Sequence, residues 1–200
     1  MWTQFAKRRH VSLDGYLGDI ESHLNDHHPY KDSDVMTWAH EGTHGVNSLA
    51  RNYMPDYNCM YTLDDNMFVA KEPKFLLSTL AKSIPQELRG EIYKTYLLDS
   101  QRWWNDCPLY ILDELSAYIN GHMVGIQLHT QVNSSRLEHN FIFAIEMLGY
   151  CAILVKMTKN DPELICFMKY ATEGIKIWLH NFNTAQPLYN KVAKYFPYKG

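Results

Sequence analysis

The stretch MTWAHEGTHGVNSLA, residues 36–50, constrains the fold of this chain more than any other. Its histidines, His40 and His44, stand four residues apart, and this spacing brings both rings to one face if the stretch is helical. The run Asp-Ser-Asp at 32–34 supplies helix-capping side chains directly before it, and negative charge favours a helix N-terminus. The sequence therefore predicts a helix that begins after this run and ends near Asn52, ahead of a proline.

The two imidazoles of this helix are placed to bind one zinc ion from the same side. Glu41 lies between them in the sequence, about 100° around the helix axis from His40. Its carboxylate can therefore reach a water beside the ion without becoming a ligand. A carboxylate in that position acts as a general base on a water whose pKa zinc lowers toward about 7. We predict Zn²⁺ as the cofactor, His40 and His44 as metal ligands, and Glu41 as the catalytic base.

A catalytic zinc needs a third protein ligand and one open position. The position six residues after His44 is alanine rather than histidine, so the third ligand must come from elsewhere. The best candidate is Glu114, in the stretch PLYILDELSAYINGHMVG, residues 108–125, which belongs to a predicted helix. Ala117 and Gly121 follow it at offsets of three and seven. This small-residue face would let the second helix approach the first closely enough to place a carboxylate on the ion.

With HEGTH at residues 40–44 and ELSA at 114–117, the sequence resembles the gluzincin group of zinc metallopeptidases. These enzymes combine HExxH with a glutamate from a later helix, often as ExxA. The resemblance covers the two helices only, and it implies a zincin-like domain that hydrolyses peptide bonds in a peptide or protein substrate. It departs from the group in two ways. Tyr118 stands where an acidic residue often orients a zinc histidine, and the predicted hairpin follows the metal helix instead of preceding it.

Three neighbours of Glu114 on the same predicted helix remain open alternatives. Asp113 is adjacent and is a rival third ligand. His122 lies two turns after Glu114 and is a candidate ligand or a donor to the oxyanion of a tetrahedral intermediate, a role that Tyr118 can also fill. For each of them, ordinary packing in the core is the competing interpretation.

The rest of the chain predicts a predominantly α-helical α+β fold in a single domain, residues 1–200. Turn formers at 64–66 separate two apolar and aromatic runs, which predicts a β-hairpin of residues 59–63 against 67–71. This hairpin is the one convincing strand signal, and its edge is a candidate site for pairing with an extended peptide. Further helices are predicted over residues 17–24, 74–83, 85–98, 108–129, 135–157 and 162–182.

Composition narrows the function classes. The net charge is -3, which gives no electrostatic case for nucleic acid or an anionic membrane surface. We identify no signal peptide and no apolar run of membrane-spanning length, so we expect a soluble protein and favour the cytoplasm. The four cysteines show no paired spacing and are expected to be reduced thiols. His23 and His27 also have i,i+4 spacing, but their polar surroundings favour a solvated cluster.

The main prediction is a zinc-dependent metallopeptidase. Two alternatives remain open: a zinc-binding module without catalysis, and a helical interaction module in which HExxH arose by chance.

Overall fold

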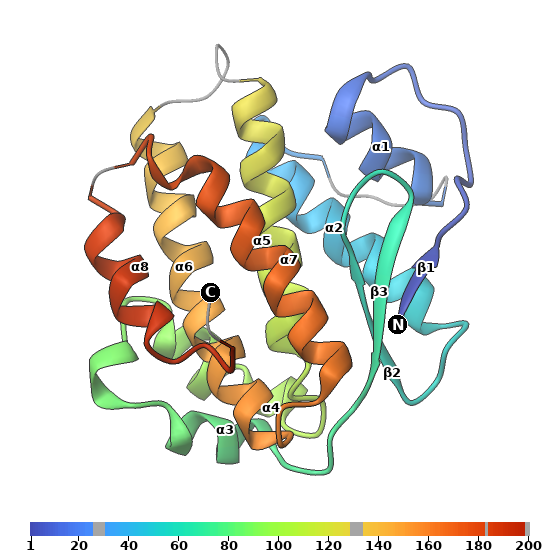
Figure 1. Ribbon diagram of the computed structural model, residues 1–200. Helices are drawn as coiled ribbons and strands as arrows, with labels where there is room; N and C mark the ends of the chain where they lie inside the picture. Colours follow the sequence, from blue (N-terminus) through green and yellow to red (C-terminus); the bar gives the residue numbers. More distant parts are fainter. Residues whose placement is uncertain (26–30, 129–133, 183, 199–200) are drawn as a thin grey trace. The chain divides into compact units, whose positions relative to one another are not determined.

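The computed structural model describes residues 1–25, 31–128, 134–182 and 184–198 (Figure 1). Within these ranges the chain is mostly helical and contains a small three-stranded antiparallel sheet, so the predicted α+β class is confirmed. The chain divides into two compact units, one formed by residues 1–71 and 116–140 and the other by 72–115 and 141–200. The single domain stays a prediction.

The elements of the first part of the chain are β1 (Trp2–Gln4), α1 (Gly15–His23), α2 (Val35–Arg51), β2 (Tyr57–Tyr61) and β3 (Asn66–Lys71). They are followed by α3 (Leu77–Ser83), a 3-10 turn (Gln86–Leu88), a π-helical segment (Lys94–Asp99), α4 (Gln101–Trp104), α5 (Tyr110–Gln127), α6 (Ser134–Met157), α7 (Pro162–Leu179) and α8 (Gln186–Ala193). The helix α5 is continuous and contributes residues to both units.

The sheet has the strand order β1-β3-β2, so β3 is its central strand. Phe68 of β3 pairs with Trp2 on one side and with Met60 on the other. The predicted hairpin is confirmed, but β3 is not an edge strand as the hairpin alone suggested. No local sequence pattern predicts β1, because this strand is only three residues long and depends on pairing with a strand more than sixty residues away.

The helix α2 begins where the capping residues predict. The Asp34 carboxylate accepts hydrogen bonds from the backbone N–H of Met36 (3.0 Å) and of Thr37 (3.5 Å). Such a cap satisfies donors that a helix start otherwise leaves unpaired. Arg136 holds the other carboxylate oxygen at 2.8 Å. The apolar side of α2 is buried, and α2 contacts α1 and β2. This packing fixes the helix that carries both histidines.

The second unit departs from the predicted helix over residues 85–98. The chain there forms a 3-10 turn and a π-helical segment instead. Between them, the buried Glu146 carboxylate of α6 accepts hydrogen bonds from the backbone N–H of Glu91 and of Ile92, both at 3.2 Å. These N–H groups are satisfied by a side chain distant in sequence, so an uninterrupted helix is not required to satisfy them. The short α8 was also not predicted.

The helix α6 of 24 residues is the one helix of the described chain whose length and hydropathy would suffice to cross a membrane. The expectation that no apolar run reaches membrane-spanning length is therefore corrected for α6, although 72% of its most apolar 18 residues is buried inside the structure. Gly149 of α6 lies against Val192 of α8, where an added Cβ would stand 3.2 Å from a Val192 methyl. A mostly buried core helix of a soluble protein can have the same length and hydropathy as α6.

Candidate metal centre

The histidine pair of α2 is arranged as its spacing predicts. The Nε2 atoms of His40 and His44 lie 3.1 Å apart, and the ring centroids are separated by 4.7 Å at an interplanar angle of 79°. Both residues are half-buried. The two Nε2 atoms therefore converge on one point beside the helix, which is the arrangement that a shared cation requires.

Glu114 of α5 joins this pair. One carboxylate oxygen of Glu114 and one ring nitrogen of each histidine all lie within 4.8 Å of one another. Glu114 is only 9% exposed. In the described part of the chain, the group includes neither Asp113 nor His122. The structure thus brings together the three residues that were predicted from the sequence as metal ligands.

The donor set fits a zinc ion. Two histidines and one glutamate form a ligand set found in catalytic zinc sites. Metal–ligand bonds of about 2.0–2.2 Å in a tetrahedron place neighbouring ligand atoms roughly 3.3–3.6 Å apart, and the observed 3.1 Å between His40 and His44 is close to that spacing. A small outward movement of the two rings would accommodate the ion. Other divalent metals accept the same donors, so the group is a candidate metal site that the donor set does not assign to one metal.

The predicted small-residue face of α5 is present at Gly121. A Cβ added at Gly121 would stand 2.9 Å from the backbone oxygen of Met36 and 3.5 Å from the Cβ of His40. The backbone of α5 therefore lies directly against the first turns of α2. Ala117, one turn earlier, is fully buried. This close approach is what brings Glu114 of α5 near the histidines.

A buried layer of polar side chains, not predicted from the sequence, joins α2, α5 and β2. Asn47 donates to the Ser116 hydroxyl at 3.2 Å and accepts from the Tyr61 N–H at 2.6 Å. Asn120 donates to the Thr43 hydroxyl at 3.2 Å and to the Tyr61 carbonyl at 3.0 Å. Each of these bonds is buried. Because a buried polar group without a partner costs about 1–3 kcal/mol, this layer fixes the two helices against the strand.

The same layer covers the outer edge of β2. Thr62 N–H donates to the carbonyl of Asn66 at 3.0 Å, and hydrogen-bonded pairs alternate along an antiparallel ladder. The backbone groups of Tyr61 therefore point away from β3, and both are bound by the Asn47 and Asn120 side chains. The backbone groups of Tyr61 are therefore not available to an extended peptide, and peptide pairing elsewhere along the hairpin edge stays a prediction.

Glu41, Tyr118 and His122 have distinct surroundings. Glu41, which follows His40 on α2, is half-buried like the two histidines. The Tyr118 ring packs edge-on against His40, with 4.7 Å between the centroids and an angle of 75°. His122 is 4% exposed, and burial lowers its pKa to about 4. It is therefore neutral near pH 7, and its predicted contact with the reacting group stays a prediction.

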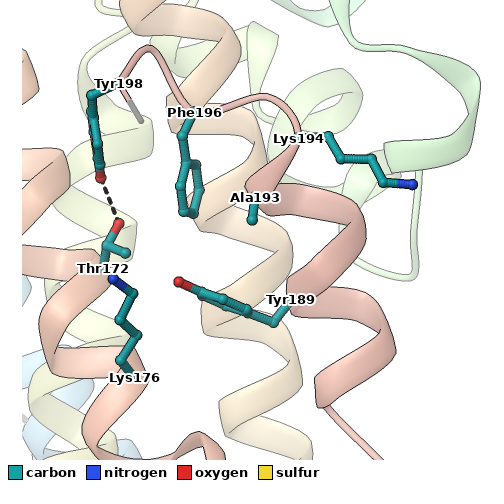
Figure 2. Close-up of a pocket in the computed structure, with 7 residues that line it drawn as sticks. All are labelled: Thr172, Lys176, Tyr189, Ala193, Lys194, Phe196 and Tyr198. Carbon is teal, nitrogen blue, oxygen red and sulfur yellow. Dashed lines mark hydrogen bonds between the residues drawn. The ribbon is translucent and has the colours of Figure 1, made fainter. Parts of the chain in front are cut away.

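A separate cavity of about 420 Å³ lies in the second unit, between α7, α8 and the following segment (Figure 2). It is lined by Thr172, Lys176, Tyr189, Ala193, Lys194, Phe196 and Tyr198. None of the predicted site residues is among them, so the case for a metal centre rests on α2 and α5.

No protein-family model, curated protein or solved structure matches the sequence.

Proposed function

We propose that this chain is a zinc-dependent metallopeptidase, with His40, His44 and Glu114 as the ligands and Glu41 as the general base. The observation that carries the proposal is the convergence of the HEGTH histidines with Glu114 from a second helix. A chance HExxH does not require a third ligand at metal-binding distance. The intact glutamate between the histidines favours catalysis over metal binding alone.

Bound zinc would supply a Lewis acid that polarises the substrate carbonyl and lowers the pKa of water toward about 7. Glu41 accepts one proton from water as the water oxygen bonds to the carbonyl carbon. It then delivers that proton to the amine nitrogen as the C–N bond breaks. Glu41 is only half-buried on α2, and we expect its carboxylate to be within reach of both water and substrate.

Tyr118 and His122 are the proposed donors to the developing oxyanion. They follow Glu114 on α5 at offsets of four and eight, and therefore share its side of the helix. Tyr118 already contacts a ligand histidine. A neutral His122 retains one N–H to donate, and a donor of this kind typically contributes about 3 kcal/mol to the transition state.

The proposed substrate is a peptide or protein, without a nucleic acid or membrane partner. The net charge of -3 supports the last two exclusions. Since the Tyr61 backbone groups of β2 are bound by two side-chain amides, we expect groups other than these to hold the substrate backbone. Side-chain recognition is then expected to contribute more to specificity than pairing with this strand does.

The test combines zinc content with hydrolysis of fluorescein-labelled casein by the full chain. Glu114→Ala should lose one zinc per chain, whereas Glu41→Gln should retain zinc and lose activity by about 10²-fold or more. Glu173→Gln, an exposed carboxylate on α7, is the matched control and should change neither quantity. Zinc binding without hydrolysis in the parent would overturn catalysis and leave a zinc-binding module. If the parent chain binds no zinc, the remaining interpretation is a helical interaction module.

A further inference from the structure

A second cluster of metal-ligand type lies in the first unit, on α1 and the β2–β3 turn. His23 Nε2 lies 3.0 Å from an oxygen of Asp65 and 3.7 Å from an oxygen of Asp19, and the three ligand atoms all fall within 4.8 Å of one another. We propose that Asp19, His23 and Asp65 bind a divalent transition cation. This site shares no residue with the proposed catalytic centre and does not depend on the proposed function.

His23 is buried in a way that directs its Nε2 atom to the two carboxylates. The ring is 0% exposed, and it lies between Phe5 and Tyr61 with centroid distances of 5.6 and 4.8 Å. Its Nδ1 atom is buried and makes no hydrogen bond within the described chain. The polar partners of this fully buried imidazole are therefore the carboxylates at Nε2. The expected solvated cluster is wrong for His23, while His27 lies outside the described residues.

Asp19 is held in place by the groups around it. Its Oδ2 atom accepts hydrogen bonds from the Tyr61 hydroxyl at 2.7 Å and from the Asp64 N–H at 3.0 Å. The Oδ1 atom is the one that faces His23. Metal-binding carboxylates are usually oriented by such outer hydrogen bonds. One oxygen of Asp19 is thus used for positioning, and the other is directed to the proposed ion.

The turn between β2 and β3 brings the third ligand over His23. Leu63, Asp64 and Asp65 have positive φ angles of 66°, 50° and 60°, a region that residues other than glycine seldom adopt. The Phe5 N–H also donates to the Asp65 carbonyl at 2.8 Å. This hydrogen bond fixes the Asp65 backbone against the N-terminal segment, and the Asp65 carboxylate lies beside the His23 imidazole.

The charge at this cluster is incompletely balanced. Lys7 is the nearby cation, and its Nζ atom lies 3.8 Å from Asp19 Oδ1 and 3.6 Å from Asp65 Oδ1. These distances exceed the 2.7–2.9 Å of a charge-assisted hydrogen bond, and the Lys7 side chain is 54% exposed. A divalent ion that displaced the ammonium would neutralise both carboxylates. Lys7 is thus a competitor for the position of the ion.

An ion can reach the cluster from solvent. Asp19, Asp65 and Lys7 line a cavity of about 420 Å³ at the surface of the first unit. One imidazole with two carboxylates suits Zn²⁺ or Mn²⁺ better than Ca²⁺, which prefers oxygen ligands alone. The bound ion would connect α1 to the β2–β3 turn and thereby stabilise the first unit.

The experiment titrates Zn²⁺ into the metal-free full chain by calorimetry, in a His44→Ala background that disables the α2 histidine pair. One zinc should still bind per chain, and a further Asp65→Asn substitution should abolish it. In the same background Lys7→Gln should tighten binding roughly tenfold, because the competing cation is gone. Glu173→Gln is the matched control and should leave zinc binding unchanged.

Three results would overturn the proposal: no zinc bound in the His44→Ala background, equal binding after Asp65→Asn, or weaker binding after Lys7→Gln. The last result would mean that Lys7 completes a purely ionic cluster. Circular dichroism of each variant checks that the chain remains folded. A failure of the catalytic centre would appear separately, as no loss of zinc when Glu114 is replaced in the parent chain.

Discussion

The contact between α2 and α5 can be tested by a single methyl group. Gly121→Ala would place a Cβ 2.9 Å from the Met36 carbonyl oxygen, closer than such atoms pack in proteins. The obstacle is backbone in the first turn of α2, so it cannot rotate away as a side chain would. The two helices must separate by some tenths of an ångström, and His40, whose Cβ lies 3.5 Å from the same position, moves with α2.

The magnitude follows from two opposing effects. Replacing a helical glycine by alanine gains about 1 kcal/mol of helix propensity, whereas overpacking a close contact costs about 1–3 kcal/mol. Gly174 on α7 is the matched control, since an added Cβ there meets nothing within 4 Å. We expect Gly174→Ala to stabilise the chain by about 1 kcal/mol. Gly121→Ala should be less stable than that control by the steric cost alone, about 1–3 kcal/mol.

The assay is urea denaturation of metal-free protein followed by circular dichroism, with each variant compared with the parent. Zinc affinity is measured in parallel, and Gly121→Ala should weaken it about tenfold because the helix carrying Glu114 is displaced. Gly174→Ala should leave zinc affinity unchanged. If Gly121→Ala is as stable as Gly174→Ala and binds zinc normally, the close approach of α5 to α2 does not set the site.

Three further predictions concern buried groups. His122 has a pKa of about 4 in the folded chain and about 6.5 in the unfolded chain, so the unfolded chain binds more protons between these two pH values. The free energy of unfolding of the metal-free protein should therefore fall by up to about 3 kcal/mol as the pH drops from 6.5 to 4. The fall should be smaller in the His122→Gln variant. Glu146→Leu should cost about 1–3 kcal/mol in urea denaturation, because the buried Ile92 N–H and the part-buried Glu91 N–H lose their acceptor. Burial raises the pKa of the Cys151 thiol, so iodoacetamide should leave Cys151 unmodified in the folded protein while it modifies the exposed Cys166. Mass spectrometry measures the labelling of each cysteine, and equal labelling of both would contradict the burial of Cys151.

The sequence predicted the elements whose ends are decided locally. Asp34 caps α2 and Asp161 caps α7, each by accepting backbone hydrogen bonds from its own helix start. The segment 85–98 could not be predicted in the same way, because the carboxylate that satisfies its N–H groups comes from Glu146, more than fifty residues away. β1 was missed for the same reason, since its pairing partner is distant in the chain.

The candidate site also combines features that are set within one helix with contacts that depend on residues distant in sequence. The spacing of His40 and His44 is a property of one helix, so sequence alone was enough to predict their convergence. Thr43 and Asn47 lie on the same stripe at offsets of three and seven from His40, a signal that could have marked them as part of the site. Their partners on α5 and β2 become apparent only in the folded chain. One face of α2 therefore presents the proposed zinc ligands and also fixes the sheet, so a change that shifts β2 should also reorient the histidines.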